Sequence, residues 1–161
     1  MASGKLARGR LRRPGIELQF HRVNKSLWPL FARHHYLNPS VSDSCRFYLS
    51  TVEGNPACIC ALMVRPHRKP FWAVSRIVTL PDYQGIGIGS TTLDWSASQM
   101  KGYRTKIKTS HPGFIKYLEK SKSWKIHIVN KAGEVGTHKN LDTSTSMSRI
   151  TVSAQYVGNR S

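Results

Sequence analysis

The chain has 161 residues, in which 25 lysines and arginines outnumber 8 aspartates and glutamates, for a formal net charge of +17. This length suits one domain with a real hydrophobic core. The sequence has no apolar run of transmembrane length and no secretory hydrophobic segment, and its three cysteines do not make an even disulfide framework. We therefore expect a protein of the reducing cytoplasm, without a membrane partner.

The excess of positive charge bears on the kind of partner. A basic surface attracts polyanions and raises the rate at which they are encountered, so nucleic acid, and DNA in particular, is the first candidate. A basic surface that has no specific partner is the alternative interpretation.

The N-terminal part of the chain combines a basic arm with a strand and a helix. Residues 1–15 carry five cations and no acid, which is typical of a disordered arm. Apolar and polar residues alternate over Ile16–Val23, as in a half-buried strand. A helix capped by Asn24 or Ser26 then runs towards Tyr36.

Three β-rich runs follow. The first two, Arg46–Val52 and Ala57–Val64, are separated by a turn composition and predict a hairpin. The third, Trp72–Thr79, leads into a glycine-rich segment and then a helix. Four apolar residues define one face of that helix: Ile86, Leu93, Ala97 and Met100.

The rest of the chain predicts three strands and one short helix. The strands are Arg104–Thr109, Trp124–Val129 and Arg149–Val157, and the helix is Gly113–Lys120. The complete order is β-α-β-β-β-α-β-α-β-β, without a repeat. This order predicts an α/β fold with a mixed sheet flanked by helices, in a single domain over residues 16–161.

The glycine-rich segment is the strongest functional signal in the sequence. A strand, a glycine turn and a helix together direct free N–H groups and the positive end of a helix at a phosphate. The spacing of Gly85, Gly87 and Gly89 does not match the dinucleotide fingerprint, and no lysine follows Gly89 as in a Walker loop. The segment is therefore a phosphate-binding candidate of another type, with a purely structural turn as the alternative.

The pattern Gln84-x-x-Gly87-x-Gly89, with Pro81 before it, resembles the coenzyme A pyrophosphate loop of the GNAT superfamily of N-acetyltransferases. The resemblance spans roughly residues 16–158, and it implies a GNAT-like domain whose fourth and fifth strands splay apart around acetyl-CoA. The strand would hold the pantetheine and acetyl group, the turn the pyrophosphate, and hydroxyls of the helix would add donors. The cofactor-binding residues that the resemblance implies are Ile77, Val78, Thr79, Gln84, Gly85, Ile86, Gly87, Ile88, Gly89, Ser90 and Thr91.

A second pattern of the same family follows the fifth strand. Many GNAT members have an Asn or a similar residue there and a Tyr seven positions later, and Ser110 and Tyr117 have this spacing. The resemblance implies a catalytic role at both positions, with Tyr117 protonating the departing thiolate, as a phenol with a pKa near ~10 can. An aromatic residue that only packs a short helix is the alternative. The Gly-Phe that usually closes the pattern is replaced by Ser121-Lys-Ser-Trp124.

Acetylation of an amine at neutral pH also needs a base. None of the eight acidic residues is obviously placed for this, whereas histidine has a suitable intrinsic pKa. His34 and His35 lie in the helix–loop region that faces the substrate in the GNAT fold. Because adjacent helical residues point about 100° apart, we expect at most one of them, preferably His35, to face the site. A water relay and a structural role for either histidine are the alternatives.

A narrower resemblance concerns the acceptor. The segments beginning at His34, Arg76, Thr109 and Ser153 are similar to a branch that includes phage GNAT proteins linked to DNA-base modification, such as Mom-type proteins, and GNAT domains fused to ABC-type ATPases. It implies an acceptor amine on a modified or exocyclic base, which must leave the duplex stack. The substrate-binding residues expected are His34, Tyr36, Arg46 and His111, with Arg68 and Trp72 also at the mouth.

Other functions stay open. The acceptor is alternatively a protein lysine or a small polyamine, although a cationic acceptor suits a +17 chain poorly. A nucleic-acid-binding module that keeps the fold without the chemistry is the non-enzymatic alternative. Cys58 and Cys60 alternate in a β-run and share one face, and only Cys45 and scattered histidines could complete a metal site. We therefore expect buried thiols and no metal.

Overall fold

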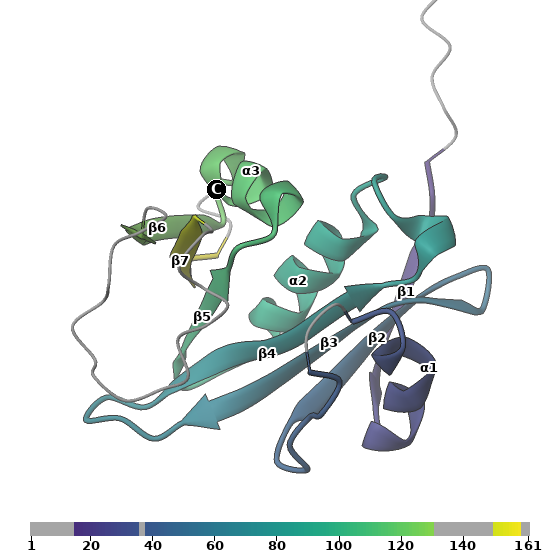
Figure 1. Cartoon of the computed structure of the whole chain (residues 1–161), viewed down its shortest axis with the longest axis horizontal. Helices are drawn as coiled ribbons and strands as arrows, with labels where there is room; N and C mark the ends of the chain where they lie inside the picture. The colour runs from purple at the N-terminus through teal and green to yellow at the C-terminus, as the bar shows by residue number, and fades with distance from the viewer. Residues whose placement is uncertain (1–14, 36–37, 131–149, 159–161) are drawn as a thin grey trace, which may run out of the picture.

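A computed structural model describes residues 15–35, 38–130 and 150–158 (Figure 1). Within these residues seven strands form one sheet in the order β1-β2-β3-β4-β5-β7-β6. The strands are β1 (Leu18–Val23), β2 (Arg46–Val52), β3 (Asn55–Arg65), β4 (Phe71–Thr79), β5 (Arg104–Thr109), β6 (Trp124–Asn130) and β7 (Thr151–Tyr156). The helices are α1 (Trp28–Ala32), α2 (Ile88–Ser98) and α3 (Pro112–Lys120), with short 3-10 helices at Lys25–Leu27 and Pro81–Tyr83. The expected basic arm at residues 1–15 lies outside the described residues except for its last residue.

The sheet is mixed, as the order of elements predicted. Strands β1 to β4 pair antiparallel, β4 and β5 pair parallel, and β7 pairs antiparallel with both β5 and β6. The single parallel pair arises because α2 carries the chain from β4 across one face of the sheet before β5 begins. The predicted α/β architecture and the order of its elements are therefore confirmed.

Strands β4 and β5 splay apart, and this positions the site. They pair only where Phe71–Ala73 lies beside Arg104–Lys106, although β4 continues to Thr79 and β5 to Thr109. The register between β3 and β4 shifts at the same level, so that Ser75 is an extra residue on β4. A bulge of this kind bends a strand, which here accompanies the separation of β4 from β5. The predicted wedge between the fourth and fifth strands is present.

Helices cover both faces of the sheet (Figure 1). On one face the predicted apolar residues Leu93 and Ala97 of α2, with Met100 just after the helix, pack into the core with Leu62 and Trp72. On the other face α1 buries two aromatic side chains against β2, β3 and β4. Ile86 does not join the buried face as its spacing predicted, because α2 begins two residues later and its side chain is half exposed.

The helix after β1 is shorter than expected. It ends at Ala32, where the amides of His34 and His35 donate to the carbonyls three residues earlier, which tightens the last turn. The Trp28 indole then donates to the Pro39 carbonyl over 2.7 Å, so the chain folds back on the helix. Among the described residues no helix is long and apolar enough to span a bilayer.

The three cysteines are free thiols in the core. Cys58 and Cys60 are fully buried in β3, and Cys45 is buried beside β2. Burial raises the pKa of Cys58 to about 11 and that of Cys60 further. The expectation of buried thiols is confirmed, and in the described part of the chain no three histidine, cysteine or acidic side chains gather as metal ligands would.

Candidate active site

A cavity of about 700 Å³ opens where β4 ends and α2 begins. Its walls come from the turn after α1, the last residues of β4, the glycine turn, and α3 with the residue before it. The residues that line it are His34, His35, Ile77, Val78, Thr79, Tyr83, Gln84, Gly85, Gly87, Gly89, Ser90, His111, Gly113, Phe114 and Tyr117. A second cavity, of about 310 Å³, fills the wedge between β4 and β5 and shares four of these residues: His35, Ile77, His111 and Phe114.

The glycine turn is held against the end of β4 and leaves its outer surface bare. The Gln84 side-chain amide donates to the Thr79 carbonyl over 2.9 Å, which fixes the start of the turn. Gly85 and Gly87 have positive φ angles of 77° and 91°, and a Cβ atom at either position would meet nothing within 4 Å. The main chain of the turn is therefore open to a ligand at the two positions where L side chains are also conformationally disfavoured.

The third glycine has a different role. A Cβ atom on Gly89 would lie 2.8 Å from Thr79 Oγ1 and 3.3 Å from Phe114 Cζ. The absence of a side chain thus lets the first turn of α2 pack against both β4 and α3. The three glycines, which the sequence presented as one motif, divide into two that expose the main chain and one that permits packing.

The N-terminus of α2 points its free amides at this turn. Gly87 at the N-cap provides no side-chain cap, and the first N–H groups of a helix have no partner within it. The hydroxyls of Ser90 and Thr91 both donate to the Gly87 carbonyl, over 2.9 and 3.0 Å. We expected these hydroxyls to be donors for a ligand, but in the structure their protons are used within the helix. Ile88 is buried, so only its main chain is available to a ligand.

Tyr117 reaches the cavity from α3 and is tied to a carboxylate that the sequence analysis did not single out. Its hydroxyl donates to Asp94 Oδ2, and the Trp124 indole donates to Asp94 Oδ1 over 2.7 Å. Burial, followed by the hydrogen bond to Asp94, raises the pKa of Tyr117 to about 12. The phenol therefore stays protonated at neutral pH, and its proton is directed at Asp94.

One feature of the sequence could have drawn attention to Asp94. It is the only acidic residue in α2, and it lies in a chain that has only eight acids in all. Its partners come from α3 and β6, so the contact itself depends on tertiary packing that no local pattern reports.

Both consecutive histidines line the cavity. We expected at most one to face it, on the premise that they are helical, but α1 ends before them and both lie in the following turn. Arg33 Nε donates to His34 Nε2 over 3.1 Å, and the ring of His35 lies 6.2 Å from that of Trp28. His35 also lines the wedge cavity, whereas His34 does not.

The segment between β5 and α3, together with the first turn of α3, contributes three further side chains. Ser110 lines the wedge cavity but not the larger one. His111 lines both, and its Nδ1 accepts from the Gly113 amide over 3.1 Å, so it caps α3. Phe114, which the sequence analysis passed over, lines both cavities and lies at the contact with Gly89.

Three residues expected at the mouth lie elsewhere. Arg46 begins β2 opposite Leu62, and its guanidinium stacks 4.5 Å above the ring of Trp72, which is buried in the core. Arg68 lies in the loop before β4, at the opposite end of that strand from the glycine turn. The placement of Arg46, Arg68 and Trp72 at the mouth was therefore wrong, because strand direction carries them away from it. Tyr36 lies outside the described residues.

Comparison with known proteins identifies the fold. No protein-family model matches the sequence, and no curated protein is similar to it. Among solved structures, the ribosomal-protein-S18-alanine N-acetyltransferase from Escherichia coli matches with a TM-score of 0.62 and 12% identity, over 87% of this chain and 93% of that one.

Two further structures place ligands on the same fold. A Bacillus subtilis acetyltransferase in complex with CoA matches with a TM-score of 0.59 and 13% identity, over 87% of this chain and 98% of that one. Arabidopsis thaliana Naa50, in complex with the bisubstrate analogue CoA-Ac-MVNAL, matches with a TM-score of 0.55 and 17% identity, over 84% and 97% of the two chains. The chain therefore has the fold of the GNAT N-acetyltransferases.

Proposed function

We propose that the protein is an acetyl-CoA-dependent N-acetyltransferase that transfers the acetyl group directly to a primary amine. One observation carries the proposal: the bare glycine turn at the uncapped start of α2 opens into the same cavity that Tyr117 and the two histidines line. Amides at a helix N-terminus bind phosphate, and the side chains needed to move protons lie across the cavity from them.

The residues present fit coenzyme A. The main chain of the turn, from Gly85 to Ser90, is suited to the pyrophosphate because no side chain blocks Gly85 or Gly87. The edge of β4 at Ile77–Thr79 is free of pairing with β5 and is suited to the amides of the pantetheine arm. Acetyl-CoA supplies the acetyl group as a reactive thioester. The B. subtilis neighbour was solved with CoA, which supports the same ligand here.

Acetyl transfer requires two proton transfers, for which His35 and Tyr117 are the candidates. As the new C–N bond forms and the C–S bond breaks, the amine loses a proton and the sulfur gains one. His35, which lines both cavities, is the candidate base, directly or through water. Tyr117 is the candidate acid, and it must turn its hydroxyl away from Asp94 to protonate sulfur. Asp94 therefore competes for the proton that Tyr117 would deliver.

The acceptor we propose is an amino group on a modified base in DNA. The charge of +17 favours an anionic substrate over a cationic one, and the segments quoted above resemble the phage branch of the family. A protein N-terminus is the second candidate, because the E. coli neighbour is named for an alanine of ribosomal protein S18 and the Naa50 ligand carries a peptide.

Three measurements test the proposal. Isothermal titration with acetyl-CoA is expected to show binding at tens of micromolar or tighter, and the absence of binding would refute the enzyme. DNA and a panel of peptides are then each incubated with the protein and labelled acetyl-CoA. The DNA is digested to nucleosides, and the nucleosides and the peptides are analysed by mass spectrometry. Label on nucleosides supports DNA as acceptor, and label only on peptide N-termini replaces it with the second candidate. Tyr117→Phe is expected to lower kcat by about 10²-fold or more while acetyl-CoA still binds.

A further inference from the structure

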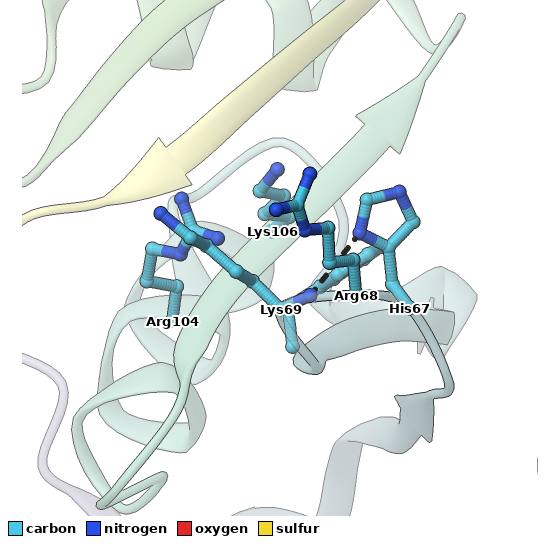
Figure 2. A pocket seen from close by; sticks show the side chains of 6 residues that line it. His67, Arg68, Lys69, Arg104 and Lys106 are labelled. Atoms are coloured by element: carbon cyan, nitrogen blue, oxygen red, sulfur yellow. Dashed lines mark hydrogen bonds between the residues drawn. The ribbon is translucent and has the colours of Figure 1, made fainter.

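Another cavity, separate from both the active-site cavity and the wedge cavity, lies at the end of β4 opposite the glycine turn, and we call it the hollow. Its volume is about 380 Å³, and Figure 2 shows the side chains that surround it, which come from the loop before β4, from the first residue of β4 and from β5. The lining residues are His67, Arg68, Lys69, Phe71, Arg104 and Lys106. Because β4 is nine residues long, this hollow lies roughly 25 Å from the glycine turn.

Strand geometry makes the hollow the start of a basic row. Side chains of a strand alternate between faces, so Arg104, Lys106 and Lys108 of β5 share one face. On the opposite face Thr105 is buried, and Ile107 joins the core cluster that also holds residues of α2 and α3. Lys108 also lines the wedge cavity between β4 and β5. The row therefore leads from the hollow directly to the wedge.

Within residues 15–35, 38–130 and 150–158, the cations of the hollow have no counter-ion. No carboxylate lines it, and the one ion pair among the described residues joins Lys25 to Asp43 elsewhere. Several like charges at one place repel each other, and this repulsion is relieved when an anion binds. Arg68, Lys69 and Arg104 are exposed, so an anion in solution can reach them.

Local contacts hold parts of the hollow in place before any ligand arrives. The Lys106 ammonium lies 4.8 Å from the centre of the Phe71 ring, a cation–π contact that limits the motion of a flexible side chain. The His67 ring lies edge-on to the same ring at 6.3 Å, and its Nδ1 accepts from the Lys69 amide over 3.4 Å. Figure 2 shows this last bond as a dashed line.

We propose that this hollow and the row Arg104-Lys106-Lys108 bind the phosphodiester backbone of DNA, and so hold the acceptor strand across the sheet towards the wedge. The inference rests on the proposed function for the identity of the polyanion. The contacts are with phosphates, so they set affinity and orientation but not base sequence. The site thus explains how a substrate much larger than the cavity would be retained during turnover.

The test compares two double variants that remove the same charge. Arg104→Gln with Lys106→Gln empties the hollow of two cations, whereas Lys120→Gln with Lys122→Gln removes two exposed cations at the end of α3. The probe is a fluorescent 20-base-pair DNA duplex, titrated over a series of salt concentrations. The variant with Arg104→Gln and Lys106→Gln is expected to bind DNA at least tenfold more weakly. Its plot of the logarithm of the binding constant against the logarithm of salt concentration should be less steep by about 1.8, because each lost phosphate contact on a duplex reduces that slope by about 0.9. The α3 variant is expected to change affinity less than threefold.

Controls separate this inference from the proposed function. Acetyl-CoA affinity is expected to be equal in the wild type and both variants, because the hollow lies far from the glycine turn; a wild type that fails to bind acetyl-CoA refutes the enzyme but not the hollow. Equal loss of DNA affinity in the two double variants, or no loss in either, would refute DNA binding at the hollow. A wild-type protein that binds anionic lipid vesicles but not DNA would refute it as well. Arg68→Gln with Lys69→Gln, in an exposed loop, replaces the first variant if it does not fold.

Discussion

The Tyr117 hydroxyl donates a hydrogen bond to Asp94, and this contact joins α3 to α2 at the wall of the cavity. The same carboxylate accepts from the Trp124 indole, so one acid links two helices and β6. The helix that presents its N-terminus to the glycine turn is thereby fixed to the helix that carries the candidate acid. A substitution at Asp94 should therefore change both the free energy of unfolding and the rate of acetyl transfer.

Replacement of Asp94 by alanine should be strongly destabilising. It leaves the Tyr117 hydroxyl and the Trp124 Nε1 without their acceptor, and hydrogen bonds to a charged group contribute about 1.5–3 kcal/mol each. Because both contacts are only partly buried, water can replace part of the lost bonding, and we expect the free energy of unfolding, measured by urea denaturation, to fall by about 2–4 kcal/mol. Glu119→Ala, an exposed acid on α3, is the matched control and should change it by less than about 0.5 kcal/mol. Equal effects of the two changes would mean that the network does not stabilise the fold.

The raised pKa of Tyr117 predicts a loss of stability at alkaline pH. Its pKa is about 12 in the folded protein and near 10 when exposed, so the folded state holds the proton more tightly. The resulting stabilisation is fully present below pH ~10 and is lost as pH rises towards ~12. Urea denaturation between pH 8 and 11.5 should show a steeper alkaline decline for the wild type than for Tyr117→Phe. Parallel declines would show that Tyr117 titrates normally.

Local patterns in the sequence specified most of the fold. The bounds of β2 and β5 were predicted to the residue, because a run of six or seven β-favouring residues between turn residues is a local property of the chain. The end of α1 was not, since turn bonds at His34 and His35 and the contact of Trp28 with Pro39 determine it. The glycine motif was found, but the separate role of Gly89 depends on contacts with β4 and α3.

The parts of the site that the sequence did not predict come from several elements at once. Asp94, Tyr117 and Trp124 are brought together by α2, α3 and β6, and no spacing along the chain encodes that meeting. Arg46 was misplaced for a related reason, because a residue type was assigned to the mouth without the direction of its strand. To predict either the contacts of Asp94 or the position of Arg46, the arrangement of the strands in the sheet had to be known.

The buried thiols should be inert in the folded protein. Burial raises the pKa of all three cysteines, to about 11 for Cys58, and so disfavours the thiolate that reacts with disulfide reagents. Ellman's reagent at pH 8 should label none of them over an hour in native buffer, and three per chain in guanidinium chloride. Rapid labelling of one thiol in native buffer would show that Cys45, the least deeply buried of the three, is accessible.

The division among the glycines can be tested with a pair of substitutions that share the same backbone strain. Gly87 and Gly54 both have positive φ and open space where a Cβ would lie, but only Gly87 borders the cavity. Gly87→Ala and Gly54→Ala should each lower the free energy of unfolding by about 1 kcal/mol. Only Gly87→Ala should also weaken acetyl-CoA binding in a calorimetric titration, because its methyl group keeps the pyrophosphate from the main chain. Gly87→Glu should abolish binding, since it adds both bulk and negative charge. Unchanged affinity in the Gly87 variants would show that coenzyme A does not bind at this turn.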